Sequence, residues 1–256
     1  MQQRSLHHEY ELYIEREIEA YKESVSRNVL LSIGDEAVAS LDDQQQLALT
    51  ELLVWQVVDG IIMRRLGLPG YAAWRSRRLR RLKAYRRPEH WGFAHDAPIV
   101  KASAATDAEP LHVLVSGTQS ESSALFMAAH GWDVTAVESE ADNMERVMAA
   151  ACDAGITSRV HGFITNLGNF APTVPLTAVV FTQHAFAGLS LDERARAIAV
   201  LQSATRDGGV HLVETIVAGH AALTLDELRA SYEGWQISVE DDRGSAPTFV
   251  ARKRAS

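Results

Sequence analysis

The sequence contains a single cysteine, Cys152, among its 256 residues. A disulfide within the chain would need a second cysteine, and a zinc site built from several cysteines is excluded for the same reason. A chain this poor in cysteine is typical of a reducing compartment, so we expect a cytoplasmic location.

Long hydrophobic segments are also missing. The first 23 residues, MQQRSLHHEYELYIEREIEAYKE, have no apolar h-region, so we expect no signal peptide. The longest apolar stretch, 47–63, is interrupted by Glu51, Gln56 and Asp59 and is too short and too charged to cross a bilayer. We therefore expect no membrane partner.

Acidic residues are missing from one region. Ten of the 25 Lys and Arg residues lie within 64–87, where there is no Asp or Glu; the 15 that remain face 33 acids, so the rest of the chain carries a net charge of −18. The basic segment has two interpretations: it tracks a phosphate backbone while Tyr71, Trp74 and Tyr85 stack on bases, or it pairs with acids elsewhere, such as those of the Glu-rich first helix. We favour the second, because the aromatic spacing suits inward packing and the whole chain is acidic.

Residues 1–95 show helical periodicity throughout. Apolar residues at helical spacing predict a first helix that begins near Tyr10 and ends before Gly34. Ser40 is expected to cap a second helix, whose apolar face comprises Leu47, Leu52, Trp55, Val58 and Ile62. A third helix carries the arginines and ends before Pro88. We predict that this region caps the ligand edge of the second domain and supplies substrate specificity and homodimer contacts.

Residues 96–110 have no periodicity and are interpreted as a linker. Beyond them, within 111–256, short apolar runs alternate with helical stretches. The predicted strands are 111–115, 133–137, 159–165, 176–182, 210–214, 235–241 and 248–253, and the predicted helices are 122–130, 141–154, 191–204 and 224–233. This pattern predicts an α/β fold, with a Rossmann-like, mostly parallel sheet, helices on both faces and an antiparallel final pair.

The carboxyl ends of parallel strands are where such sheets bind ligands. After the first strand, Gly117 allows a tight turn and Ser120 is a candidate helix cap; the alternative is an ordinary capped turn. Glu138 ends the second strand, 21 residues after Gly117, where an acid suits the hydroxyls of a ribose. A solvated acid at a strand end is the alternative interpretation.

Polar residues also follow the third and fourth predicted strands. The side-chain oxygen of Asn166 can accept a hydrogen bond from an adenine amino group, although Asn-Leu-Gly-Asn is also a common turn. Gln183 and His184 follow the fourth strand. His184 is a candidate base or substrate contact, with a structural hydrogen-bonding role as the alternative.

The order of these segments resembles that of the class I S-adenosylmethionine-dependent methyltransferases. The resemblance rests on VLVSGTQSESSALFMAAHGWDVTAVE, HGFITNLGNF, LTAVVFTQHAF, LQSATRDGGVHLVE and WQISVEDDRGSAPTFVARK, which span 111 to about 254. It implies S-adenosylmethionine as cofactor. The cofactor-binding residues it implies are Gly117, Thr118, Gln119, Glu138, Ser139, Asn166, Leu167 and Gln183.

This chain departs from the family pattern in the first loop. Of the usual Gly-x-Gly-x-Gly only Gly117 is present, with Gln119 and Glu121 at the other two positions. Val115 and Asn166 stand where the family usually has acids. These departures support an alternative, a methyltransferase-like module that binds or assembles without catalysis. A nicotinamide-dependent oxidoreductase is disfavoured, because Glu121 would repel a pyrophosphate at the helix N-terminus.

Methyl transfer from a sulfonium is a direct displacement that depends on alignment, so neither a nucleophile nor a metal has to be present, and we predict no metal site. We expect a small-molecule acceptor. A hydroxyl or protonated amine acceptor would need a base. His184 is the first candidate for that base and His220 the second.

Overall fold

A computed structural model describes residues 5–41, 51–104, 111–117, 121–214, 223–240 and 247–255. Its α-helices are α1 (Leu6–Ser24), α2 (Arg27–Ala39), α4 (Glu51–Leu66), α5 (Tyr71–Tyr85), α6 (Pro98–Ala104), α7 (Ser122–Ala129), α8 (Ala141–Ala154), α9 (Leu191–Ala204) and α10 (Leu225–Ser231). The strands are β1 (His112–Ser116), β2 (Asp133–Glu138), β3 (Val160–Ile164), β4 (Leu176–Phe181), β5 (Thr205–Glu214), β6 (Gln236–Glu240) and β7 (Thr248–Arg252). Three 3-10 helices, η1 (Pro88–Trp91), η2 (Thr157–Arg159) and η3 (Leu167–Asn169), complete the described elements.

Contacts divide the chain into two units, residues 1–79 and 80–256. The division falls within α5. The domain boundaries at 95 and 110 remain predictions from the sequence.

The first unit is helical, as predicted. Helices α1, α2 and α4 enclose a core that comprises Ile18, Ile33, Ala37, Val58, Ile61 and Ile62. The predicted break at Gly34 is wrong, because Gly34 lies inside α2 and the chain turns at Val25 and Ser26, which are both extended. A glycine costs a helix only about 1 kcal/mol, which the burial of Ile33 and Ala37 on either side outweighs.

One further expectation for this unit is corrected. Ser40 is the C-cap of α2, and its hydroxyl donates to the carbonyl of Ala37 over 2.7 Å; residues 42–50, where the helix predicted after Ser40 would begin, lie outside the described residues. The apolar face predicted for the next helix is narrower than expected, because Leu52 is 75% exposed and Trp55 is 50% exposed, whereas Val58 and Ile62 are buried. Lys22 lies over the Trp55 ring at 5.2 Å and partly covers it. Leu47 lies outside the described residues.

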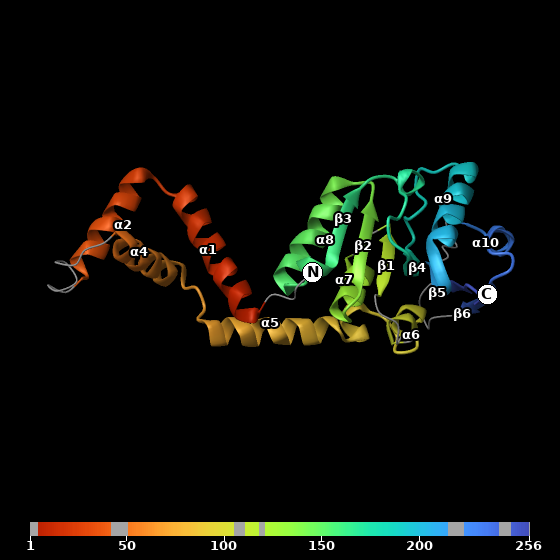
Figure 1. Ribbon diagram of the computed structural model, residues 1–256, viewed down its shortest axis with the longest axis horizontal. Coiled ribbons are helices and arrows are strands. Elements are labelled where there is room, and N and C mark those ends of the chain that lie inside the picture. Colours follow the sequence, from red (N-terminus) through yellow and green to blue (C-terminus); the bar gives the residue numbers. More distant parts are fainter. Residues whose placement is uncertain are drawn as a thin grey trace. The chain divides into compact units, whose positions relative to one another are not determined.

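The second unit contains a seven-stranded sheet in the order β3-β2-β1-β4-β5-β7-β6 (Figure 1). Strands β1 to β5 are parallel, and β7 runs antiparallel to both β5 and β6. The predicted fold class is therefore confirmed, including the antiparallel end. The predicted strand and helix bounds in this unit hold to within two residues except at the start of β5.

Strand β5 begins at Thr205 rather than at Val210. Thr205 pairs with Leu176, and the pairing then shifts so that Val210 is opposite Ala178. The extra residues include Gly208, whose φ is +74°, a conformation suited to glycine. Residues Arg206 to Gly209 thus form a bulge inside β5.

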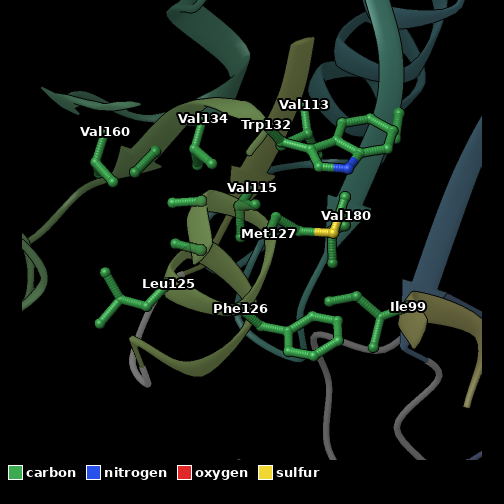
Figure 2. Packing of buried hydrophobic residues seen from close by; sticks show 14 of the residues in the cluster. Ile99, Val113, Val115, Leu125, Phe126, Met127, Trp132, Val134, Val160 and Val180 are labelled. Carbon is green, nitrogen blue, oxygen red and sulfur yellow. The ribbon is translucent and has the colours of Figure 1, made fainter. Parts of the chain in front are cut away.

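Helices cover both faces of the sheet. On one face α6, α7 and α8 pack against strand residues such as Val113, Val115 and Val134, and Figure 2 shows Leu125, Phe126 and Met127 of α7 among them. On the other face α9 and α10 pack against Leu114, Val179 and Val213. The alternation of Val113, Leu114 and Val115 between the two clusters explains why β1 is apolar without a break.

Helix α6 lies within 96–110, the range interpreted as a linker. Its Ile99 and Ala102 are buried in the same cluster as α7. A seven-residue helix is too short to show a clear period in the sequence, which is why this element was not predicted. Within the described part of the chain, no helix is both long and apolar enough to cross a membrane.

Candidate cofactor site

Four residues at the carboxyl ends of the parallel strands form one row across the sheet. The strand register aligns Val137 of β2, Ser116 of β1, Phe181 of β4 and Val213 of β5. The next residues are Glu138, Gly117, Thr182 and Glu214, which we call the end row. Side chains of one row lie on the same face of a sheet, and three strand spacings separate β2 from β5 by about 14 Å. An acid therefore stands at each end of this row.

Glu138 is 6% exposed at the tip of β2. Its Oε1 accepts hydrogen bonds from the backbone N–H of Ser139 at 2.8 Å, from the Ser139 hydroxyl at 3.3 Å and from the backbone N–H of Glu140 at 3.3 Å. Glu140 is the N-cap of α8, so this carboxylate also lies at the positive end of that helix. These donors hold a charged carboxylate in place at the edge of the sheet.

Gly117 lets β1 and the turn after β4 approach closely. Its φ is +80°, and a Cβ atom there would lie 2.4 Å from the backbone nitrogen of Ala185 and 2.8 Å from the carbonyl carbon of His184. The Thr182 hydroxyl donates to the Ser116 carbonyl at 3.1 Å and also contacts the Gly117 carbonyl. The sequence predicted a tight turn at Gly117, and the structure adds this contact. Thr118 and Gln119 lie outside the described residues.

The turn after β4 presents two of the predicted site residues at the surface. Ala185 and Phe186 are buried and anchor the turn. Gln183 and His184, which lie between Thr182 and these two buried residues, are exposed. The second candidate base, His220, lies outside the described residues.

Glu214 was not singled out from the sequence. It ends β5 and is partly buried. Burial raises the pKa of its carboxyl from 4.5 to about 6, and the backbone N–H of Gln183 opposes this rise. The signal was present in the sequence, because the apolar run 210–213 ends in an acid just as the run before Glu138 does.

Asn166 and Leu167 follow β3 beside Glu138. The backbone N–H of Thr165 donates to the Glu138 carbonyl at 2.8 Å, which continues the β2–β3 pairing up to this point. The Asn166 side chain accepts from the backbone N–H of Gly168 at 2.8 Å and caps η3, the turn that the sequence offered as an alternative. The Leu167 side chain is buried in the core beside α9.

The arginine-rich helix α5 is tied to the protein by some of its cations. Arg78 pairs with Glu9 of α1 at 2.6 Å, so the Glu-rich first helix is a partner, as expected. Arg86 Nε donates to the Ala129 carbonyl at 2.7 Å, and Arg81 contacts Asp153. Tyr71 and Trp74 pack against the ring of Tyr10. The remaining cations of the segment are exposed.

No protein-family model matches the chain, and no curated protein matches it by sequence. Solved structures do match. TehB from Haemophilus influenzae matches with a TM-score of 0.51 and 14% identity, over 65% of this chain and 65% of that one. The N-methyltransferase NodS from Bradyrhizobium japonicum WM9 matches with a TM-score of 0.50 and 12% identity, over 63% of this chain and 100% of that one. The glycopeptide N-methyltransferase MtfA matches with a TM-score of 0.51 and 12% identity, over 64% of this chain and 92% of that one.

The fold is that of the class I S-adenosylmethionine-dependent methyltransferases. Within this methyltransferase fold, Glu138 and Asn166 lie at neighbouring strand ends. The end row of this chain extends the set of polar groups to the end of β5. Among the described residues, no group of three or more metal-binding side chains lies together.

Proposed function

We propose that the protein is an S-adenosylmethionine-dependent methyltransferase that acts on a small molecule. The observation that carries the proposal is the Glu138 carboxylate, held by three donors at the tip of β2 in a sheet with the methyltransferase strand order. The fold neighbours support it: NodS and MtfA are named as N-methyltransferases, and one MtfA structure with a TM-score of 0.51 contains sinefungin.

The residues present fit this cofactor. S-adenosylmethionine offers a ribose diol, an adenine, a cationic sulfonium and an ammonium group. Glu138 provides the acceptor that a diol needs, and an end row with two carboxylates suits a ligand that carries positive charge. When bound, the cofactor supplies an electrophilic methyl group.

The chain's own residues have distinct proposed roles at this site. Glu138 accepts hydrogen bonds from the ribose hydroxyls, and Ser139 fixes the orientation of Glu138. Asn166 and Leu167 line the adenine side through their turn. Gln183 and the loop residues Gly117, Thr118 and Gln119 border the reacting end. Residues 1–95 would provide acceptor specificity and homodimer contacts.

Calorimetry with S-adenosylmethionine and S-adenosylhomocysteine tests the proposal. Wild type is expected to bind both, and Glu138→Gln should weaken both by 1.5–3 kcal/mol, about 10- to 150-fold, because charge-assisted hydrogen bonds are lost. Glu145→Gln, which removes an exposed acid from α8, is the matched control and should change neither affinity. Absence of binding in folded wild type would refute the proposal. Product bound at least as tightly as substrate favours an enzyme over a non-catalytic module.

A further inference from the structure

Strand β3 forms one end of the sheet, so one of its two sides has no neighbouring strand among the described residues (Figure 1). Four of its five residues are exposed, and they include Phe163 at 46% and Ile164 at 60%. Large apolar side chains beside a row of unpaired backbone groups favour the addition of another strand. The open side of β3 is therefore a surface whose partner has to offer a strand.

The direction of the backbone groups in β3 follows from one hydrogen bond. The backbone N–H of Thr165 donates to the Glu138 carbonyl of β2 at 2.8 Å. Successive residues of a strand direct their backbone groups to opposite sides. Those of Gly162 and Ile164 consequently point away from β2, to the open side.

This open side lacks the devices that protect most sheet edges. Residues 160–165 contain no lysine, proline or acid, and the pairing of β3 with β2 runs without a bulge. Arg159 at the start of the strand donates to the Gly131 carbonyl at 2.6 Å, so its charge is held toward β2. Strand β6, at the other end of the sheet, ends in Glu240, which is paired with Lys101. Of the two ends, β3 is thus the one open to pairing.

A second copy of β3 fits this side when it runs antiparallel about a two-fold axis at Gly162. The Gly162 N–H of each copy then donates to the Gly162 carbonyl of the other, and each Ile164 N–H donates to the Val160 carbonyl of the other. The Val160 N–H needs no partner across the axis, because it is bound to the Thr157 carbonyl of its own chain. The residues on the open side are thus symmetric about the central glycine, as a two-fold contact requires.

The side chains and the covering helix also suit this register. His161 of one copy lies opposite Phe163 of the other in a non-hydrogen-bonded pair, with Cα atoms about 4.5 Å apart and their rings in contact. No Asp, Glu, Lys or Arg occurs in the strand, so no like charges meet. Helix α8 contacts β2 as well as β3, which separates two copies of α8 by about two strand spacings, or about 10 Å, a normal distance for packed helices.

We propose that the protein forms a two-fold dimer through antiparallel pairing of β3, which joins the two seven-stranded sheets into one. The contact does not depend on the proposed function, and it covers Phe163 and Ile164 of both copies. Ile164 is the register partner of Glu138, so Val160 of the second copy lies one strand beyond the proposed ribose position. The homodimer contacts proposed for residues 1–95 use a different surface.

Sedimentation equilibrium of the full chain from about 1 to 100 µM tests the contact. Wild type is expected to self-associate, and Ile164→Lys should weaken the association at least about tenfold, because a lysine protects the edge. Leu191→Lys is the matched control: Leu191 of α9 is also apolar and is 64% exposed, and its replacement should leave the association unchanged. A wild type that stays monomeric overturns the proposal, as does association that Ile164→Lys leaves intact, which would favour residues 1–95.

Cysteine cross-linking tests the register itself. In a Cys152→Ser background, which removes the only native thiol, His161→Cys and Phe163→Cys are prepared separately and then mixed. Their Cα separation across the axis suits a disulfide, whereas two cysteines at the same position would lie too far apart. Oxidation should therefore yield a covalent dimer mainly in the mixture. Absence of a covalent dimer, or equal yields from each variant alone, would overturn the two-fold pairing.

Discussion

Tyr232 donates its hydroxyl hydrogen to Nδ1 of His211 across 2.7 Å in the interior of the second unit. The direction follows from the other end of the imidazole. The Thr205 hydroxyl donates to the Leu201 carbonyl at 2.6 Å, so it accepts from Nε2 of His211 at 2.8 Å, and Nδ1 is left as the acceptor. Burial, assisted by the charge of Lys253, lowers the pKa of His211 to about 3.

Removal of the Tyr232 hydroxyl should destabilise the protein. Tyr232→Phe keeps the ring contacts with Trp235 and Phe249 but leaves Nδ1 of His211 buried and unpaired. We expect the free energy of unfolding to fall by about 1–3 kcal/mol in urea titrations. Tyr85→Phe is the control, since no hydrogen bond joins the Tyr85 hydroxyl to another described residue. Equal effects of the two substitutions would contradict the network.

Neutral His211 should make the protein acid-sensitive. Its pKa is lower in the folded state than the usual 6.5, so the unfolded chain takes up a proton that the folded chain does not. Stability from this group is complete above about pH 6.5 and declines by up to about 1.4 kcal/mol per pH unit toward pH 3. The measurement is the difference in unfolding free energy between wild type and His211→Gln from pH 7.5 to 4.5. A constant difference would show that His211 does not titrate as described.

Gly117→Ala should be far more damaging than an alanine at another glycine with positive φ. At Gly117 the added Cβ meets the backbone of Ala185 and His184, whereas at Gly131, with φ +96°, it meets nothing within 4 Å. Both variants incur backbone strain of about 1–2 kcal/mol. Gly117→Ala must in addition separate β1 from the turn after β4, so its melting temperature should fall clearly below that of Gly131→Ala. Matching melting temperatures would be evidence against the close approach.

Glu214→Gln should stabilise the protein at pH 8. The raised pKa means that folding disfavours the ionised carboxylate, so this group costs stability above about pH 6 and the cost disappears as the pH falls below 4.5. The shift corresponds to a gain of up to about 2 kcal/mol at pH 8 that vanishes near pH 4.5. Glu145→Gln, at an exposed site, should stay within about 0.5 kcal/mol of wild type throughout. A Glu214→Gln variant that is no more stable than wild type at pH 8 would mean that its carboxylate is well solvated.

The alternation of apolar runs and helical stretches was sufficient to predict the sheet, its helices and the antiparallel end. It also predicted that Glu138 lies at the end of a strand, because an apolar run that ends in an acid can be recognised in the sequence. Register is different: nothing in the sequence states that Glu138, Gly117, Thr182 and Glu214 share one row, since that depends on pairing between strands whose partner residues are up to 65 positions apart. Glu214 was therefore not predicted as a site residue, although the sequence shows an acid at the end of an apolar run there.

Local propensity misled where tertiary packing overrides it. Gly34 is a common helix-ending residue, yet α2 continues past Gly34 because Ile33 and Ala37 are buried in the core. In the same way, Ile99 and Ala102 of α6 gain order from the core they join rather than from a periodic pattern of their own.

Strand β3 ends the sheet, and four of its five residues are exposed. Among the described elements, the connection from β3 to β4 contains only the short 3-10 helix η3. This connection therefore places no α-helix over the side of β3 that bears Phe163. In the monomeric chain, the backbone hydrogen bonds of β3 should open more often than those of β1 or β4, and its amides should exchange with solvent fastest among the parallel strands. Because the Thr165 N–H is bound to the Glu138 carbonyl, a ligand held by Glu138 should slow this exchange. Deuterium uptake in β3 would thus report ligand binding at Glu138 through the most exposed of the parallel strands.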